Sequence, residues 1–357
     1  MPQSPSTIRP TPAGGRRAER RRVQCVAAGT LAALVGPVLL IGACAGETDR
    51  SGRATTTVAP ATGQAPARGA AEVDGLPRWT ARAPIDTPRD DFAHVAVGQK
   101  IWTFGGMTGD RGTRLTSTEV YDTTTDSWRY GPELPTGLTS FEGAAVGDRV
   151  YLFGGLDTAF EPSDFAAVLD TGTGRWRRLP PLPHPRYAHD VDTIGGKIYV
   201  IGGEDSSGPQ AAVDVFDPKT DRWSQGAEMP HARSSIDLAP VGDVLYVVGG
   251  WERSGPTNRV QTYRPSTDSW GKSTPMPRAM SRGGAAAVGD NLYVSYHEWS
   301  SVYDVSTRTW SAANPMTVPR HGLGYIAVGD RIYGIGGCTE HPLRDVDYVD
   351  VLDLSDT

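Results

Sequence analysis

Arginine and carboxylate side chains recur at fixed distances ahead of a repeated Gly-Gly pair. Arg89 precedes Gly105 by 16 residues, and three further arginines stand at the same interval before later pairs. Four residues after the arginine position, three consecutive copies carry a carboxylate. The arginines are Arg89, Arg186, Arg233 and Arg320, and the carboxylates are Glu142, Asp190 and Asp237. Guanidinium groups pair with carboxylates and other planar acceptors, so this pattern predicts a site for a polar ligand.

A third position lies halfway between these two and varies from copy to copy. Side chains two residues apart in a strand point to the same face, so all three positions are expected on one side of their strands. The pattern therefore predicts a polar pocket with an arginine rim over an arc of carboxylates, and it adds Asp91 and Arg282 to the candidate site. The six residues at this position are Asp91, Ser140, Ala188, Ser235, Arg282 and Gly322.

The arginines have two interpretations. They could line a pocket and bind a ligand, or they could bond loop carbonyls and the carboxylates of a neighbouring repeat. For the carboxylates we expect a functional role, because three like charges that converge repel one another and usually need a partner.

The elements that position these residues also repeat. Each copy contains an apolar strand with an aromatic residue that ends in Gly-Gly, and the first four pairs advance by 49, 48 and 47 residues. In the following strands a tryptophan comes seven residues after a large apolar residue, as Trp128 follows Tyr121. Turn-forming residues separate these segments, so each copy is predicted to form four strands. The pairs are Gly105 and Gly106, Gly154 and Gly155, Gly202 and Gly203, Gly249 and Gly250, and Gly336 and Gly337, and the tryptophans are Trp128, Trp176, Trp223, Trp270 and Trp310.

This pattern resembles the kelch-repeat β-propeller from about residue 76 to the end. A sixth, degraded copy, residues 292–296, lacks Gly-Gly but keeps the aromatic residue of the other five. The resemblance implies an all-β fold, a six-bladed kelch-type propeller with four-stranded blades. The last copy has no tryptophan seven residues after Leu352, whereas Trp79 stands unpaired ahead of the first copy. We therefore expect the N-terminal strand to close the last blade, which removes an exposed sheet edge.

In kelch propellers ligands usually meet one face, built from the loops that lead into the inner strands and the loops after Gly-Gly. The second group of loops adds Trp251 to the candidate site, as an aromatic platform for sugars or peptide side chains or as a residue packed on the next blade. The loop after the degraded copy, residues 296–299, is short and could open one side of this face.

Enzymatic interpretations are tested against particular residues. The copper radical oxidases among kelch propellers need a Cys–Tyr crosslink and copper ligands that this sequence does not match, since its histidines are scattered singly. The resemblance to six-bladed sialic acid mutarotases extends to blade count and export but to no motif. We find no nucleophile elbow, phosphate loop or Cys/His metal spacing, and we predict no cofactor, no metal site and no catalytic residue.

The N-terminus is predicted to be a targeting segment. A basic cluster at residues 16–22 precedes an apolar run at 23–40, and Ile41, Gly42, Ala43 and Cys44 resemble a bacterial lipobox, which implies lipidation of Cys44. The alternative is an uncleaved membrane anchor. The sequence thus predicts a lipoprotein signal peptide at 1–43, a flexible tether rich in Thr, Ala, Pro and Gly at 44–75, and the propeller at 76–357.

Cleavage after residue 43 would move the net charge from −6 to −11, because it removes six arginines and one glutamate. An acidic mature chain argues against nucleic acid as a partner. The predicted function is a non-catalytic binding or protein-interaction module, exported and lipid-anchored on the outer face of the cytoplasmic membrane at the cell envelope. Its partner would be a protein or a glycan, and its only membrane contact the lipid anchor; the alternative is a carbohydrate-acting enzyme of the sialic acid mutarotase type.

Overall fold

The computed structural model describes residues 73–109, 112–340 and 343–355. The predicted signal peptide, Cys44 and nearly all of the predicted tether therefore lie outside the described residues. Within them the secondary structure consists of strands and turns, and no helix is long and apolar enough to cross a membrane.

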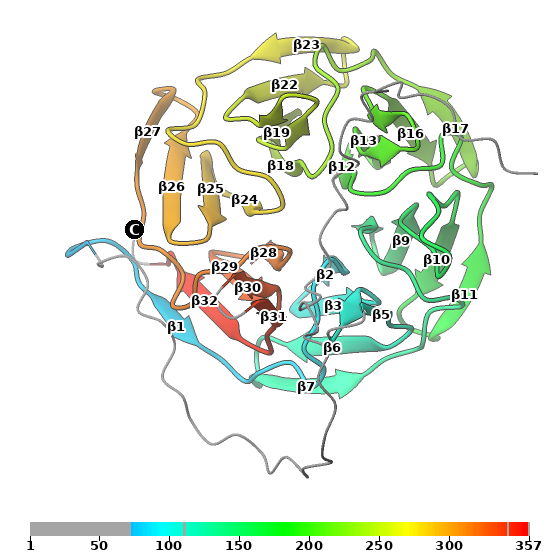
Figure 1. Cartoon of the computed structure of the whole chain (residues 1–357), viewed down its shortest axis with the longest axis horizontal. Helices are drawn as coiled ribbons and strands as arrows, with labels where there is room; N and C mark the ends of the chain where they lie inside the picture. The colour runs from blue at the N-terminus through cyan, green and yellow to red at the C-terminus, as the bar shows by residue number, and fades with distance from the viewer. Residues whose placement is uncertain (1–72, 110–111, 341–342, 356–357) are drawn as a thin grey trace, which may run out of the picture. The chain divides into compact units, whose positions relative to one another are not determined.

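Six four-stranded antiparallel sheets follow one another around a common centre (Figure 1), so the predicted six-bladed propeller is confirmed. In each blade the strand that is named first below lies nearest the centre, and the strand named last lies outermost (Figure 1). Blade one contains β2 (Ala93–Val97), β3 (Lys100–Phe104), β6 (Thr118–Asp122) and β7 (Ser127–Tyr130); blade two contains β8 (Glu142–Val146), β9 (Arg149–Phe153), β10 (Ala166–Asp170) and β11 (Arg175–Arg178); blade three contains β12 (Asp190–Ile194), β13 (Lys197–Ile201), β16 (Val213–Asp217) and β17 (Arg222–Gln225).

The second half of the chain repeats this order. Blade four contains β18 (Asp237–Val241), β19 (Val244–Val248), β22 (Val260–Arg264) and β23 (Ser269–Lys272); blade five contains β24 (Gly284–Val288), β25 (Asn291–Tyr296), β26 (Trp299–Asp304) and β27 (Thr309–Ala312); blade six contains β28 (Gly324–Val328), β29 (Arg331–Ile335), β32 (Val349–Asp353) and β1 (Trp79–Ala81).

The seven-residue spacing of the tryptophans has a direct structural cause. Each tryptophan lies opposite its partner across the hairpin of the two outer strands, as Trp128 lies opposite Tyr121. Their rings lie 5.0 Å apart, and such cross-strand aromatic pairs stabilise a sheet by roughly 0.2–1 kcal/mol each. The indole nitrogen of Trp128 donates to Ala83 O in the segment before blade one, at 2.9 Å. The tryptophan thus anchors the outer strand to the linker that precedes the blade.

The N-terminal strand closes the last blade, as predicted. Strand β1 pairs with β32, and Trp79 lies opposite Leu352, in the position that the tryptophan of the outer strand takes in the other blades. The Trp79 indole donates to Asn314 O at 2.9 Å, and the Asn314 amide donates to Leu76 O and Pro77 O. Residues from both ends of the described chain therefore share one sheet, which leaves no blade without an outer strand.

The Gly-Gly pairs join neighbouring blades. Both glycines of each pair have positive φ, 56° and 84° in Gly105 and Gly106. A Cβ on Gly106 would lie 2.6 Å from Asp90 O, so only glycine fits this close approach. The Gly106 N–H donates to Leu138 O of the next blade at 2.9 Å, and the other four pairs make the equivalent bond. The pair therefore ends one blade and holds the segment that leads into the next.

Candidate functional site

A closed ring of backbone hydrogen bonds surrounds the centre where the chain enters the inner strands. We call it the mouth ring; its members are Asp91, Ser140, Ala188, Ser235, Arg282 and Gly322. Each member donates its N–H to the carbonyl of the equivalent residue in the preceding blade, over distances of 2.7–3.1 Å. All six have a φ between 49° and 61°. This left-handed conformation turns the backbone from one blade to the next and fixes five side chains and Gly322 around the centre.

Loops that follow the second strands lie on the same face as the mouth ring. Four of them form short hairpins, and isolated bridges tie them to the segments that lead into the inner strands, as between Trp251 and Ser234. Trp251 begins the blade-four hairpin and is half-buried, so it is neither fully exposed nor packed away. The hairpins are β4 (Met107–Thr108) with β5 (Thr113–Arg114), β14 (Glu204–Asp205) with β15 (Gly208–Pro209), β20 (Trp251–Glu252) with β21 (Gly255–Pro256), and β30 (Cys338–Glu340) with β31 (Leu343–Asp345).

The four arginines of the predicted rim are fully buried, with 0% exposure. We call Arg89, Arg186, Arg233 and Arg320 the arginine layer. Arg186 donates to the Asp214 carboxylate at 2.6 Å and to Val200 O at 3.0 Å, and Arg320 does the same with Asp350 and Gly334 O. A side chain without exposed surface cannot contact a ligand, so the predicted arginine rim is wrong for this structure. The second interpretation holds instead: the arginines bond backbone carbonyls and carboxylates, although these carboxylates belong to the arginine's own blade and not to a neighbouring one.

The acidic partners of this layer were missed in the sequence. Glu119, Asp214 and Asp350 each lie in the third strand of the arginine's own blade, with side chains almost without exposed surface. The sequence contains a pattern that could have indicated these partners. In the two blades with an apolar residue in place of the arginine, such as Leu138, the residue that corresponds to Glu119 is small. This residue is Ala167 in blade two and Ser301 in blade five. The two positions vary together because they share one buried space.

Blade four has the arginine but no acid. Arg233 donates to Gln261 Oε1 at 2.7 Å and to Gly249 O at 2.6 Å. Burial lowers the pKa of Arg233 to about 10, because the charged form is desolvated; the charge of Glu252 opposes this fall and that of Arg259 adds to it. This guanidinium is therefore the least compensated of the layer.

The three predicted carboxylates begin neighbouring inner strands, two residues deeper than the mouth ring. We call Glu142, Asp190 and Asp237 the acidic arc. Asp190 Oδ2 accepts the Leu238 N–H at 2.5 Å, whereas Asp237 Oδ2 is buried without a hydrogen-bond partner in the described structure. Burial raises the pKa of Asp237 to about 7, with Glu142 adding to the rise and His94 opposing it. Burial also raises the pKa of Asp190, and the charges of Glu142 and Asp237 raise it further.

Two neighbours of the arc were not predicted. His94 on β2 lies 3.4 Å from Glu142 Oε1. Burial opposes its charged form, but Glu142 and hydrogen bonds with the backbone of Tyr325 and Phe92 together raise the pKa of His94. Asp192 lies two residues beyond Asp190 on β12, and burial raises its pKa to about 7. Strand alternation could have indicated Asp192, since residues two apart share a face. Among the described residues, the six inner strands thus carry four carboxylates and one histidine.

An ion pair crosses the mouth ring. Arg282 of blade five reaches Asp91 of blade one, with Nε 3.1 Å from Oδ1 and a second contact from Nη2 to Oδ2. The pair passes over blade six, where the ring residue is Gly322. A Cβ on Gly322 would lie 3.0 Å from Asp91 Oδ1, so glycine leaves the space through which the pair is made. Asp91 and Arg282 therefore lie on the predicted face, but they neutralise each other.

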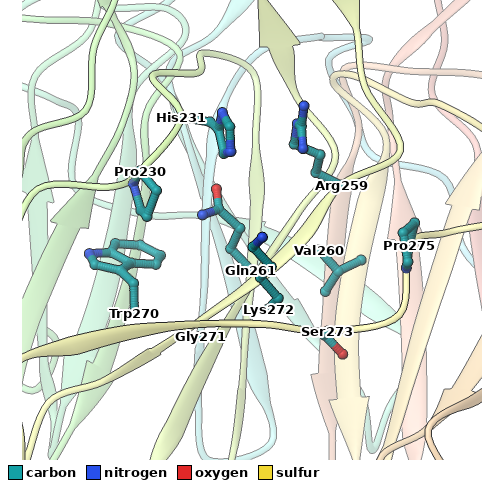
Figure 2. Close-up of a pocket in the computed structure, with 10 residues that line it drawn as sticks. All are labelled: Pro230, His231, Arg259, Val260, Gln261, Trp270, Gly271, Lys272, Ser273 and Pro275. Atoms are coloured by element: carbon teal, nitrogen blue, oxygen red, sulfur yellow. The ribbon is translucent and has the colours of Figure 1, made fainter.

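A separate pocket of about 350 Å³ lies at the edge of blade four. Figure 2 shows His231 and Trp270 on one side of it, Arg259 and Pro275 on the other, and Gln261 between them. In blade three the equivalent histidine, His184, contacts Asp214 at 3.0 Å. The sequence did not predict this pocket, which contains none of the candidate residues.

Comparison with known proteins agrees with this architecture. Residues 92–296 and, in a second match, residues 141–337 fit the sequence model of the KLHDC2/KLHL20/DRC7 kelch-repeats domain. The chain belongs to this kelch-repeat family. The two matches begin 49 residues apart (141 − 92), the interval between Gly105 and Gly154, so they differ by one kelch blade.

Individual relatives share shorter kelch segments. Kelch-like protein 15 of Gallus gallus is 31% identical over 81 residues, 23% of this chain and 16% of that protein. F-box protein AFR of Arabidopsis thaliana is 33% identical over 73 residues, 20% of each chain. Kelch-like protein 34 of Homo sapiens is 39% identical over 84 residues, 22% of this chain and 13% of that protein. The chain spans a fifth or less of these relatives, and the kelch likeness is consistent with a protein-interaction module.

Proposed function

We propose that this protein is exported, anchored to the membrane by a lipid on Cys44, and binds a partner protein at the cell envelope without catalysis. Binding uses the face that carries the mouth ring and the four hairpins, which we call the mouth face. The observation that carries this proposal is the gathering of these segments on one face, where backbone hydrogen bonds hold them in place. A surface fixed in this way loses little conformational freedom on binding, which favours affinity.

The lipid anchor is supported by the basic cluster, the apolar run and the small residues before Cys44. The test is labelling of cells that express the full chain with a palmitate analogue. Wild-type protein is expected to carry the label and to sediment with membranes, whereas Cys44→Ala is expected to carry none. Equal labelling of the two forms would contradict lipidation at this cysteine.

The binding face is tested by photocrosslinking in cells of the source organism. A crosslinking amino acid is placed at Ser206 or Ser254, in exposed hairpin turns of the mouth face, and as matched controls at Asp148 or Asp290, in exposed turns at the other end of the inner strands. A discrete product from the first pair alone is expected. The same product from the controls would overturn the assignment of the face.

One observation favours a second candidate, a carbohydrate-acting enzyme of the sialic acid mutarotase type. Asp237 has a carboxylate oxygen without a partner and a pKa raised to about 7 by burial, and its environment includes Glu142 and His94. Such a group could give or take a proton near neutral pH. An anomer-exchange assay with sialic acid distinguishes the two functions. Exchange that Asp237→Asn abolishes would favour the enzyme, and no exchange would leave binding as the function.

A further inference from the structure

The mouth face carries a cluster of metal-binding side chains that the sequence did not predict. One ligand atom each from His297, His321 and Glu340 lies within 4.8 Å of the others. His297 Nε2 is 3.2 Å from Glu340 Oε1, and the two imidazole rings are 5.0 Å apart. The predicted absence of a metal site rested on histidines scattered singly along the chain, but the fold brings two of them together.

His297 occupies a position where the other blades have glycine. It aligns with the second residue of the Gly-Gly pairs, keeps a positive φ of 51°, and donates its N–H to Arg320 O of the next blade at 3.3 Å. His297 thus makes the hydrogen bond to the next blade that the second glycine of the pair makes elsewhere. It also adds an imidazole to the mouth face. Histidine is enriched among non-glycine residues with positive φ.

Blade five makes room for this side chain. In the other blades a Cβ on the second glycine would lie 2.5–2.9 Å from the side chain three residues after the arginine position, for example 2.5 Å from Ile236 in the case of Gly250. In blade five that residue is Gly283. The bulky residue and the glycine have exchanged places, so the histidine fits without the clash that its Cβ would cause elsewhere.

The other two ligands come from blade six and are tied to each other. His321 leads into β28, and its backbone forms a bridge with Cys338, with N–O distances of 3.1 and 2.8 Å. Cys338 begins β30, which ends at Glu340. Arg282 interacts electrostatically with His321, but its guanidinium is paired with Asp91.

We propose that His297, His321 and Glu340 bind a divalent transition-metal ion of the zinc type at the edge of the mouth ring. Two imidazole nitrogens and one carboxylate oxygen are a donor set that suits Zn²⁺ and leaves a fourth position open. The three residues lie on the face proposed above for the partner, but the metal site does not depend on that proposal.

The experiment measures zinc binding by the full chain, purified without a histidine tag and stripped with a chelator. A chromogenic chelator competes for Zn²⁺, and the binding stoichiometry and affinity of the variants are compared. His297→Gly removes one ligand and restores the residue that the other blades use. We expect it to abolish one equivalent of binding or to weaken it roughly 100-fold, since even indirect disturbance of a metal site costs about 10–100-fold.

His231→Ala, which removes a partly exposed histidine in blade four, serves as the matched control and is expected to bind as the wild type does. Glu340→Gln keeps the shape of the third ligand but removes its charge, and provides the answer should His297→Gly fold poorly. Wild-type protein that binds no zinc, or zinc binding unchanged in both ligand variants, would overturn the site. Loss of binding in the two ligand variants alone supports it.

Discussion

The arginine layer lies in the segments that lead into the inner strands and the acidic arc at the first residues of those strands, yet the two are built in opposite ways. Three of the four arginines meet a buried carboxylate, and all four donate to backbone carbonyls. In the arc Asp237 keeps an oxygen without a partner, and Asp190 is surrounded by like charge. A buried charge that meets an opposite charge belongs to the fold, whereas one without such a counter-charge needs a proton, a cation or a ligand.

Removing one partner of the arginine layer should give the largest effect. Arg320→Ala leaves Asp350 buried without its cation, so we expect the free energy of unfolding to fall by about 3–5 kcal/mol. Urea denaturation of the full chain measures this. Arg264→Ala breaks the exposed pair with Asp243 and should cost less than about 1 kcal/mol. Similar losses in the two variants would show that burial does not distinguish these pairs.

Removing a charge from the acidic arc should raise the free energy of unfolding instead of lowering it. Asp237→Asn removes a carboxylate whose folded-state pKa is raised from 3.8 to about 7, so the folded wild type binds more protons than the unfolded chain between these values. The contribution of the Asp237 carboxyl to the free energy of unfolding of the wild type is therefore lost as the pH rises through 7. We expect the variant to be more stable at pH 8, by up to about 4 kcal/mol, and the difference to vanish towards pH 4.

The measurement is urea denaturation of both proteins between pH 4 and 8, with the difference taken at each pH so that other titrating groups cancel. Asp148→Asn, in an exposed turn, is the control and should show no such trend. A difference that is constant over this range would mean that Asp237 is not protonated on folding.

A substitution in blade four tests how much a buried carboxylate contributes to the arginine layer, and its expected effect is smaller. Gln261→Glu supplies Arg233 with the carboxylate that Glu119 gives Arg89 in blade one. We expect a gain of about 1 kcal/mol, since a charge-assisted bond replaces a neutral one but the new carboxylate must be desolvated. Gln99→Glu in an exposed turn should leave the unfolding free energy within about 0.5 kcal/mol. Destabilisation by Gln261→Glu would show that desolvation outweighs the pairing.

The fold could be predicted from the sequence because the same local pattern occurs in every blade. The Trp79–Leu352 pair followed from the spacing that links Tyr121 and Trp128 within one hairpin. The surroundings of the arginines were not predictable, because the left-handed backbone of Ala188 interrupts the strand alternation between Arg186 and Asp190. Only the packing against β16 shows that Arg186 is buried.

The metal cluster lies beyond what the repeat pattern can predict. His297 and His321 come from different blades, and neither has a histidine at the equivalent position elsewhere. The exchange of glycine between positions 283 and 297 is visible in the sequence, but its meaning depends on the 2.5–2.9 Å approach that the structure reveals in the other blades. Departures from a repeat therefore indicate function only when the contact that they change is known.

The smallest predicted effect concerns the proton of a single residue, His94, which lies beside the acidic arc. Burial alone would lower the pKa of His94, and the raised value depends on Glu142 beside it. In Glu142→Gln the pKa of His94 should therefore fall below that in the wild type, as followed by the chemical shift of its Hε1 proton against pH. Glu161→Gln, on an exposed loop, should leave it unchanged. An unchanged pKa in Glu142→Gln would show that another charge holds the His94 proton, and the arc would then extend beyond the residues named here.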